Sequence, residues 1–119
     1  MDERTQLGIL GEQAVADYLK KQNFKIVNIN YKTRYGEIDI IAQKDEYLLF
    51  VEVKTRINEY FPISNVITYT KQRKIINTAK LFIQINNIFD KVCRFDVATA
   101  ILKNNKFDIN YIENAFQDY

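Results

Sequence analysis

The chain has 119 residues, 47% of them hydrophobic, with 17 basic and 15 acidic side chains and a formal net charge of +2. This length suits one packed domain and is too short for two, so we expect a single domain spanning residues 1–119. The single cysteine excludes an internal disulfide and a cysteine-based zinc cluster, and the absence of histidine excludes the commonest general base and metal ligand. A charge of +2 does not by itself indicate nucleic-acid binding.

Two further features bear on the compartment. No apolar run reaches the length of a membrane span, and residues 1–6 are polar and charged rather than typical of a targeting segment. Together with the low cysteine content, this predicts a cytoplasmic protein without membrane contact. Cys93 lies at the start of an expected strand, where we expect a small buried side chain rather than a nucleophile.

The first half of the chain reads as one helix followed by strands. Apolar residues recur at helical spacing from about residue 6 to 21, which predicts an amphipathic helix. Three strands are then expected over 24–31, 37–43 and 47–54. A basic loop over 32–36 would join the first two strands, and a hairpin turn around Lys44-Asp45-Glu46 would join the next two.

The second half begins with an irregular segment over 56–66, because Pro62 excludes a central strand there. Thr70 is a suitable N-cap for a second helix running to about residue 84. Strands are expected over 94–102 and 107–112. The order α-β-β-β-α-β-β predicts an α/β domain in which helices flank a mixed sheet.

Two acids and a lysine occupy unusual places in the central strands. Asp39 and Glu52 sit inside apolar runs, and Lys54 shares a strand face with Glu52 because side chains alternate. A two-residue turn at Asp45-Glu46 would place Asp39 directly opposite Glu52. Asp-Glu is not a favoured pair for such a turn, and a four-residue loop would give the same register.

Such a pair of acids needs a compensating charge. Two carboxylates about 4 Å apart repel by roughly 4 kcal/mol at an effective dielectric constant near 20. A shared proton, the Lys54 ammonium or a bound cation could offset this, and Mg²⁺ and Mn²⁺ prefer oxygen ligands of this kind. The alternative is an ordinary Glu-Lys pair on the solvated face of an antiparallel sheet, with Asp39 at its rim.

Other charged residues could belong to the same site. Glu12 lies at the flank of the first helix's apolar stripe, where the residues alone favour a boundary glutamate with a solvated carboxylate. Basic residues cluster in sequence around the acids and at the start of the second helix, where phosphate could be bound. A basic residue of this kind, taken singly, is more often a solvated surface residue than a phosphate contact. The candidate nucleic-acid contacts are Lys32, Arg34, Arg56, Lys71, Arg73 and Lys74.

Several motifs together resemble the bacterial YraN family over nearly the whole chain. The most specific are Gly36-Glu37-Ile38-Asp39 and Phe50-Val51-Glu52-Val53-Lys54-Thr55-Arg56. Supporting matches are Gly11-Glu12, Asn30, Lys71, Arg94-Phe95-Asp96-Val97 and Asn114-Ala115-Phe116. That family is similar to the Holliday junction resolvases of the restriction-endonuclease-like PD-(D/E)xK superfamily.

The resemblance implies a restriction-endonuclease-like fold with Asp39, Glu52 and Lys54 as the catalytic trio. It further implies that Glu12 joins them from the first helix, and that Asp39, Glu52 and Glu12 hold Mg²⁺ or Mn²⁺. The implied activity is metal-dependent endonuclease cleavage of branched or structured DNA. One departure is the segment 57–62, which is bulkier than the glycine-containing loop usual at that place in the family.

Two other interpretations stay open at this point. One is a non-catalytic nucleic-acid-binding accessory module on the same fold, although intact Asp39, Glu52 and Lys54 count against it. The other is a protein-interaction domain without a nucleic-acid role. A homodimer would suit the nuclease, because symmetric incision of a four-way junction needs two sites related by a twofold axis.

Overall fold

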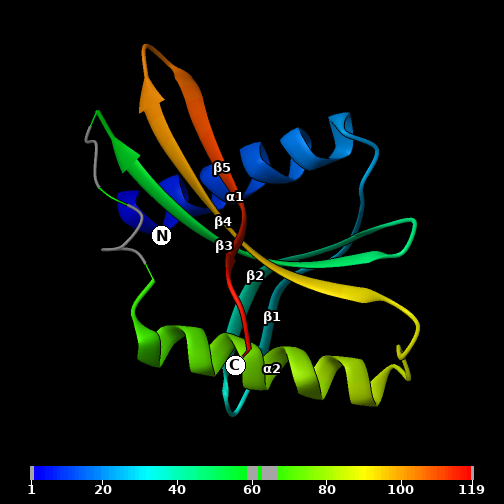
Figure 1. The fold of residues 1–119 in the computed structure, drawn as a ribbon. Coiled ribbons are helices and arrows are strands. Elements are labelled where there is room, and N and C mark those ends of the chain that lie inside the picture. The colour runs from blue at the N-terminus through cyan, green and yellow to red at the C-terminus, as the bar shows by residue number, and fades with distance from the viewer. Residues whose placement is uncertain (1, 59–61, 63–66, 119) are drawn as a thin grey trace.

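The computed structural model describes residues 2–58, 62 and 67–118. Five strands form one mixed sheet, and a helix covers each of its faces (Figure 1). The elements are α1 (Glu3–Lys21), β1 (Lys25–Thr33), β2 (Gly36–Lys44), β3 (Tyr47–Ile57), α2 (Tyr69–Ile85), β4 (Val92–Lys103) and β5 (Lys106–Phe116). Their order and the mixed α/β architecture confirm the prediction from sequence.

Strand order in the sheet follows strand order in the chain, β1-β2-β3-β4-β5. Adjacent strands are antiparallel except for the central pair β3 and β4, which are parallel. A parallel pair needs a crossover connection, and α2 supplies it. The first turn of α2 lies beside the middle of β3 and the first half of β2, where Glu52 and Asp39 lie.

Two hydrophobic clusters hold the helices to the sheet. On one face, α2 packs with Ile75, Ile76, Ala79 and Phe82 against residues that include Phe50, and the Phe50 and Phe82 rings meet edge-on at 6.1 Å. On the other face, α1 packs with Val15, Ala16 and Leu19 against apolar residues of β2, β3 and β4. Each helix is therefore fixed to the sheet by its own hydrophobic cluster.

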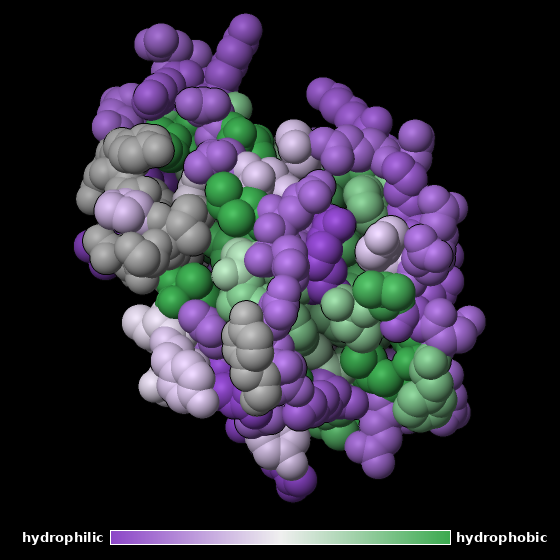
Figure 2. Space-filling view, viewed as in Figure 1, coloured by the Kyte–Doolittle hydropathy of each residue, from purple (hydrophilic) through white to green (hydrophobic). Residues whose placement is uncertain are grey.

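On the molecular surface, hydrophilic residues surround separate apolar patches (Figure 2).

The register of the β2–β3 hairpin is the one predicted. Lys44 pairs with Tyr47, and the pairing continues to Ile40 opposite Val51. The connection is the two-residue turn at Asp45-Glu46, with Asp45 in the left-handed region at a φ of 54°. The four-residue loop is thus not used.

Both helix starts differ from the prediction. The first helix begins earlier, because the Asp2 carboxylate accepts a hydrogen bond from the Thr5 N–H over 2.8 Å. The second helix is capped by Thr68 rather than Thr70, with Thr68 Oγ1 accepting from the Lys71 N–H over 3.2 Å. Lys71 is therefore a first-turn residue of α2.

Strand lengths were underestimated. The strand β1 continues through residue 33, so the expected basic loop over 32–36 contracts to a turn at residues 34–35. The strand β3 continues to residue 57, so the irregular segment expected from residue 56 starts later. Within that segment, 59–61 and 63–66 lie outside the described residues.

Two further observations concern the surface. Cys93 is exposed, which contradicts the buried position expected for it, because β4 begins already at Val92 and its first residues lie outside the core. Within the described ranges, neither helix combines the length and the apolar character that a membrane crossing needs.

Candidate functional site

Asp39 lies where β2 separates from β3. Strand pairing ends at Ile40 and Val51, one step before Asp39 and Glu52 would face each other. The alternation of side chains also breaks here, because Ile38 and Ile41 both belong to the α2-side core. Asp39 Oδ2 accepts a hydrogen bond from the Val53 N–H over 2.8 Å. The carboxylate thereby satisfies a backbone donor near the point where the two strands part.

Glu52 comes to the same place from β3. Glu52 is only 6% exposed, and its Oε1 lies 2.5 Å from the ammonium of Lys71, a residue in the first turn of α2. Asp39 and Glu52 line one cavity of about 410 Å³, together with Glu37, Lys71 and Lys74. The structure therefore brings together the two acids that the sequence predicted to meet.

The electrostatics of this cavity are those of crowded carboxylates. Burial, followed by the charge of Glu52, raises the pKa of Asp39 to about 8, against the opposing effect of the Val53 hydrogen bond. The charges of Glu12 and Glu37 act in the same direction as Glu52. A buried carboxyl group with a pKa raised by desolvation and by neighbouring acids is typical of functional sites.

Glu12 joins the acids from α1 through Asn30. The two carboxylates require the Asn30 side-chain amide to face them with its nitrogen. In this orientation the nitrogen donates to Glu12 Oε2 over 3.0 Å and to Glu37 Oε1 over 3.1 Å. Asn30 has a φ of 57°, in the left-handed region that asparagine tolerates. Burial raises the pKa of Glu12, while the Asn30 hydrogen bond opposes the shift. Glu12 is therefore half-buried and hydrogen-bonded, not the solvated boundary residue that its helical position favoured.

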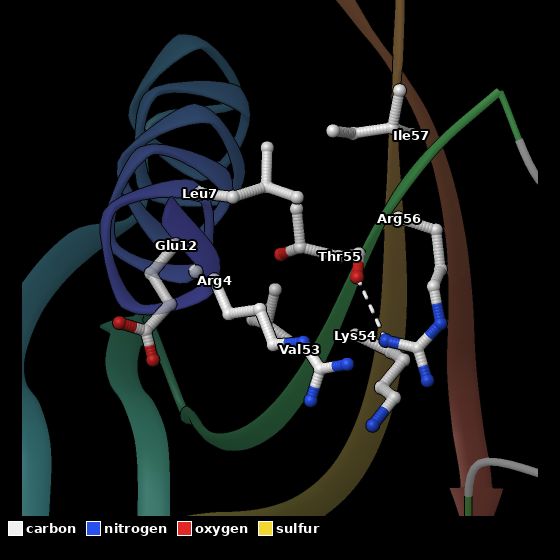
Figure 3. A pocket seen from close by; sticks show the side chains of 9 residues that line it. Arg4, Leu7, Glu12, Val53, Lys54, Thr55, Arg56 and Ile57 are labelled. Carbon is white, nitrogen blue, oxygen red and sulfur yellow. Dashed lines mark hydrogen bonds between the residues drawn. The ribbon is translucent and has the colours of Figure 1, made fainter. Parts of the chain in front are cut away.

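Lys54 borders a second cleft on the side of α1. This cleft has a volume of about 680 Å³, and Glu12 and Lys54 line it together with Arg4 and Arg56 (Figure 3). Desolvation, and then the cations Arg56 and Lys71, lower the pKa of Lys54, while Glu52 and Asp39 oppose this shift. Lys54 thus lies within electrostatic reach of both acids, as its place on the strand predicted.

The donor set suits a hard divalent cation held partly by the protein. Carboxylate oxygens are the only charged ligand atoms that Asp39, Glu52 and Glu12 offer, and Mg²⁺ typically takes one or two carboxylates and completes its shell with water and phosphate. Among residues 2–58, 62 and 67–118, no three or more His, Cys, Asp or Glu are grouped closely enough to hold a metal by themselves. The site therefore fits an ion that shares its ligands with a substrate, not a closed structural site.

The predicted basic contacts divide into two groups. Lys71 and Lys74 line the acidic cavity, and Arg56 lines the second cleft while donating to the Thr55 carbonyl over 2.9 Å. The remaining three lie outside the lining of both cavities. Arg73 pairs with Asp118 over 2.9 Å, whereas Lys32 and Arg34 are exposed on β1 and its turn.

Three members of the site were not assigned from sequence. Glu37 lies two residues before Asp39 on the same strand, so the alternation of side chains could have placed it beside Asp39. Asn30 and Arg4 gave no such signal, because their positions depend on how β1 and α1 pack beside the hairpin. Asn30 was noted only as a family match without a role.

The Arg94-Phe95-Asp96-Val97 motif has a structural explanation. Asp96 is fully buried and accepts hydrogen bonds from Arg94 Nε over 3.0 Å, the Tyr111 hydroxyl over 2.5 Å and the Asn114 N–H over 2.9 Å. These bonds span the register shift between β4 and β5 at Phe95 and Val97. Asp96 therefore secures the last strand and lies apart from the acidic cavity.

Comparison with known proteins gives the family. The sequence model of the family described as "Uncharacterised protein family UPF0102" matches residues 11–100, a range that contains Glu12, Asp39, Glu52 and Lys54. A UPF0102 protein of Clostridium novyi is 43% identical over 113 residues, covering 92% of this chain and 94% of the relative. One of Lachnoclostridium phytofermentans is 44% identical over 115 residues (94% and 93%). One of Desulforapulum autotrophicum is 42% identical over 118 residues (98% and 97%).

Proposed function

The chain belongs to the UPF0102 family, and from the geometry of its site we propose that it is a metal-dependent endonuclease. Its substrate would be branched or otherwise structured DNA, in which it hydrolyses phosphodiester bonds. The observation that carries the proposal is the meeting of Asp39 and Glu52 in one cavity where β2 leaves β3. Glu12 and Lys54 flank this acid pair, as the resemblance to junction resolvases requires.

Two acids would hold the ion directly. Asp39 and Glu52 would be its protein ligands, and Glu12, fixed by Asn30, lies beside them on α1. When bound, Mg²⁺ or Mn²⁺ lowers the pKa of a water molecule and stabilises negative charge on the phosphodiester. The hydrogen bond from Val53 to Asp39 Oδ2 fixes that carboxylate, so its geometry is set before substrate arrives.

The basic residues would act on the phosphate and the nucleophile. Lys54 can orient the attacking water or neutralise charge that develops on the phosphate, because it lies two residues from Glu52 on β3 and interacts electrostatically with both acids. Lys71 and Lys74 lie at the N-terminal end of α2, where backbone N–H groups add to their positive charge. Together these groups suit an extended polyanion such as DNA.

Removing either central acid tests the proposal. Asp39→Asn and Glu52→Gln keep side-chain size, and we expect each to lower Mg²⁺-dependent cleavage by at least about 100-fold, because loss of a metal ligand exceeds the usual cost of changing an outer-sphere group. Cleavage would be followed on labelled four-way junctions, flaps, linear duplexes and single strands with Mg²⁺, Mn²⁺ or EDTA. Asp108→Asn, an exposed acid on β5, is the matched control.

The results separate the rival functions. Unimpaired cleavage by Asp39→Asn or Glu52→Gln would refute the assignment of the site. Binding of these DNAs without cleavage under any metal condition would instead favour the accessory module. DNA affinity that falls steeply with salt would argue against a protein-interaction domain.

A further inference from the structure

The larger cleft, beside α1, is lined mainly by cations. Its charged residues are Arg4 from the first turn of α1, Lys54 and Arg56 from β3, and one acid, Glu12. In Figure 3 the Arg4, Lys54 and Arg56 side chains converge from two elements on the same opening. Gly8 lies in the α1 wall, and a Cβ there would meet no atom within 4 Å, so the cleft is open along the helix.

Arg4 is not explained by the fold itself. It is exposed, and its side chain forms no hydrogen bond or ion pair with any residue that the structure describes. A cation in the first turn of a helix also opposes the helix dipole. The guanidinium thus has no polar partner among the described residues, and it lines the cleft that Lys54 and Arg56 also line.

The cleft adjoins the acidic site. Val53 lines the cleft and donates its N–H to Asp39 Oδ2 over 2.8 Å, and Glu52 is its neighbour on β3. Glu12 and Lys54 also line the cleft, and both interact electrostatically with Asp39 and Glu52. On the other side of the acids, Lys71 and Lys74 line the smaller cavity. The acids thus lie between two basic regions, one built on α1 and β3 and the other on α2.

A nucleic-acid strand carries a charge at every nucleotide, so a strand bound at the acids must place phosphates on both sides of the one that is cut. We propose that Arg4 and Arg56, with Lys54, form a phosphate-binding subsite for the nucleotide next to the scissile bond, on the α1 side. This subsite rests on the proposed endonuclease function and assigns a role to Arg4, which sequence reasoning left without one. Its ligand is a backbone phosphate, so it contributes affinity and alignment without reading bases.

The test measures DNA binding without catalysis. Asp39→Asn protein in EDTA binds a fluorescein-labelled four-way junction and a labelled single strand, and affinity is recorded over a series of salt concentrations. Arg4→Gln, introduced into this Asp39→Asn parent, should weaken DNA binding about tenfold. It should also reduce the slope of log affinity against log salt concentration by about one. Arg4→Lys should restore most of the slope, because it keeps the charge, and Arg56→Gln should behave like Arg4→Gln.

Lys20→Gln is the matched control, since it removes a positive charge from the last turn of the same helix. It should leave the salt slope unchanged, and thermal unfolding should show that Arg4→Gln is as stable as its parent. If the parent binds DNA and Arg4→Gln binds with the same affinity and slope, the subsite is refuted while the endonuclease proposal stands. If the parent binds none of these DNAs, both proposals fail together.

Discussion

At the scale of single residues, the contact between Lys71 and Glu52 ties α2 to the acidic site. Glu52 is buried, and the Lys71 ammonium lies 2.5 Å from its Oε1 while remaining partly exposed to solvent. A buried carboxylate requires such a partner, because an unpaired charge is costly away from water. A divalent cation at Glu52 would therefore compete with this internal ammonium group.

This competition predicts that Lys71→Met binds Mn²⁺ more tightly than the parent protein in the absence of DNA. A partly exposed ion pair is worth up to about 1 kcal/mol, so we expect a gain in affinity of about fivefold. Isothermal titration calorimetry measures it directly. Lys74→Met, which alters the lining of the same cavity without removing an ion pair, should change the affinity less. Weaker Mn²⁺ binding by Lys71→Met would show instead that Lys71 positions Glu52 as a ligand.

At the scale of elements, a glycine sets the distance between α1 and β3. A Cβ built on Gly11 would lie 2.1 Å from Thr55 Oγ1 and 2.7 Å from Thr55 Cγ2, so helix and strand are in direct contact at this point. Glu12 is the next residue of the helix. The position of the third acid therefore depends on a close approach that no larger residue allows without movement of the helix or of Thr55.

Gly11→Ala should lower the free energy of unfolding by about 1–3 kcal/mol, the usual cost of overpacking, and should reduce cleavage by displacing Glu12. Gly8→Ala is the matched control on the same helix, because a Cβ at Gly8 meets nothing within 4 Å. There the change should raise stability by up to about 1 kcal/mol, since alanine favours the helix. Urea unfolding of both variants checks this, and equal effects would contradict the contact.

The sequence predicted much of the hairpin that carries the acids. Alternation of apolar residues and a two-residue turn gave the register that the structure has, from Lys44 and Tyr47 to Ile40 and Val51. Such features are local, so residues alone can specify them. The order of helices and strands was also predicted correctly, because it too depends on local patterns.

What could not be predicted depends on contacts between distant segments. The break in alternation around Asp39 arises where β2 leaves β3, and the Asn30 link between Glu12 and Glu37 requires β1 and α1 to be in place. The sequence predicted Thr70 as the cap of α2, whereas Thr68 has this role, and Lys71 lies in the first turn that follows, where it pairs with Glu52. The residues alone therefore predicted two acids with Lys54, and the family resemblance added Glu12 from the first helix. The links through Asn30 and through the Lys71–Glu52 pair came only from the structure.

At the scale of the whole molecule, the acidic site lowers the stability of the metal-free fold. Burial and the charge of Glu52 raise the pKa of Asp39 to about 8, from an ordinary value of 3.8. Between these values the folded state holds a proton that the unfolded chain releases. The free energy of unfolding should therefore fall as pH rises from about 4 to about 8.

Asp39→Asn removes this titration and retains an oxygen that can accept the Val53 hydrogen bond. We expect the variant to be more stable than the parent at pH 8 by at least about 1 kcal/mol. This is less than the free energy that corresponds to a shift of one pKa unit. At pH 4 the difference should vanish. Urea unfolding in EDTA at several pH values measures it, with Asp108→Asn as the control, and parallel curves for Asp39→Asn and its parent would contradict the raised pKa.

The strand order of the sheet has a consequence for biosynthesis. Because spatial order follows chain order, each strand meets its neighbour as it leaves the ribosome, except that β4 must wait for α2. Asp39 and Glu52 lie on one hairpin that emerges complete before Lys71, the cation that pairs with Glu52. The nascent chain thus carries its acids without their lysine until translation reaches α2.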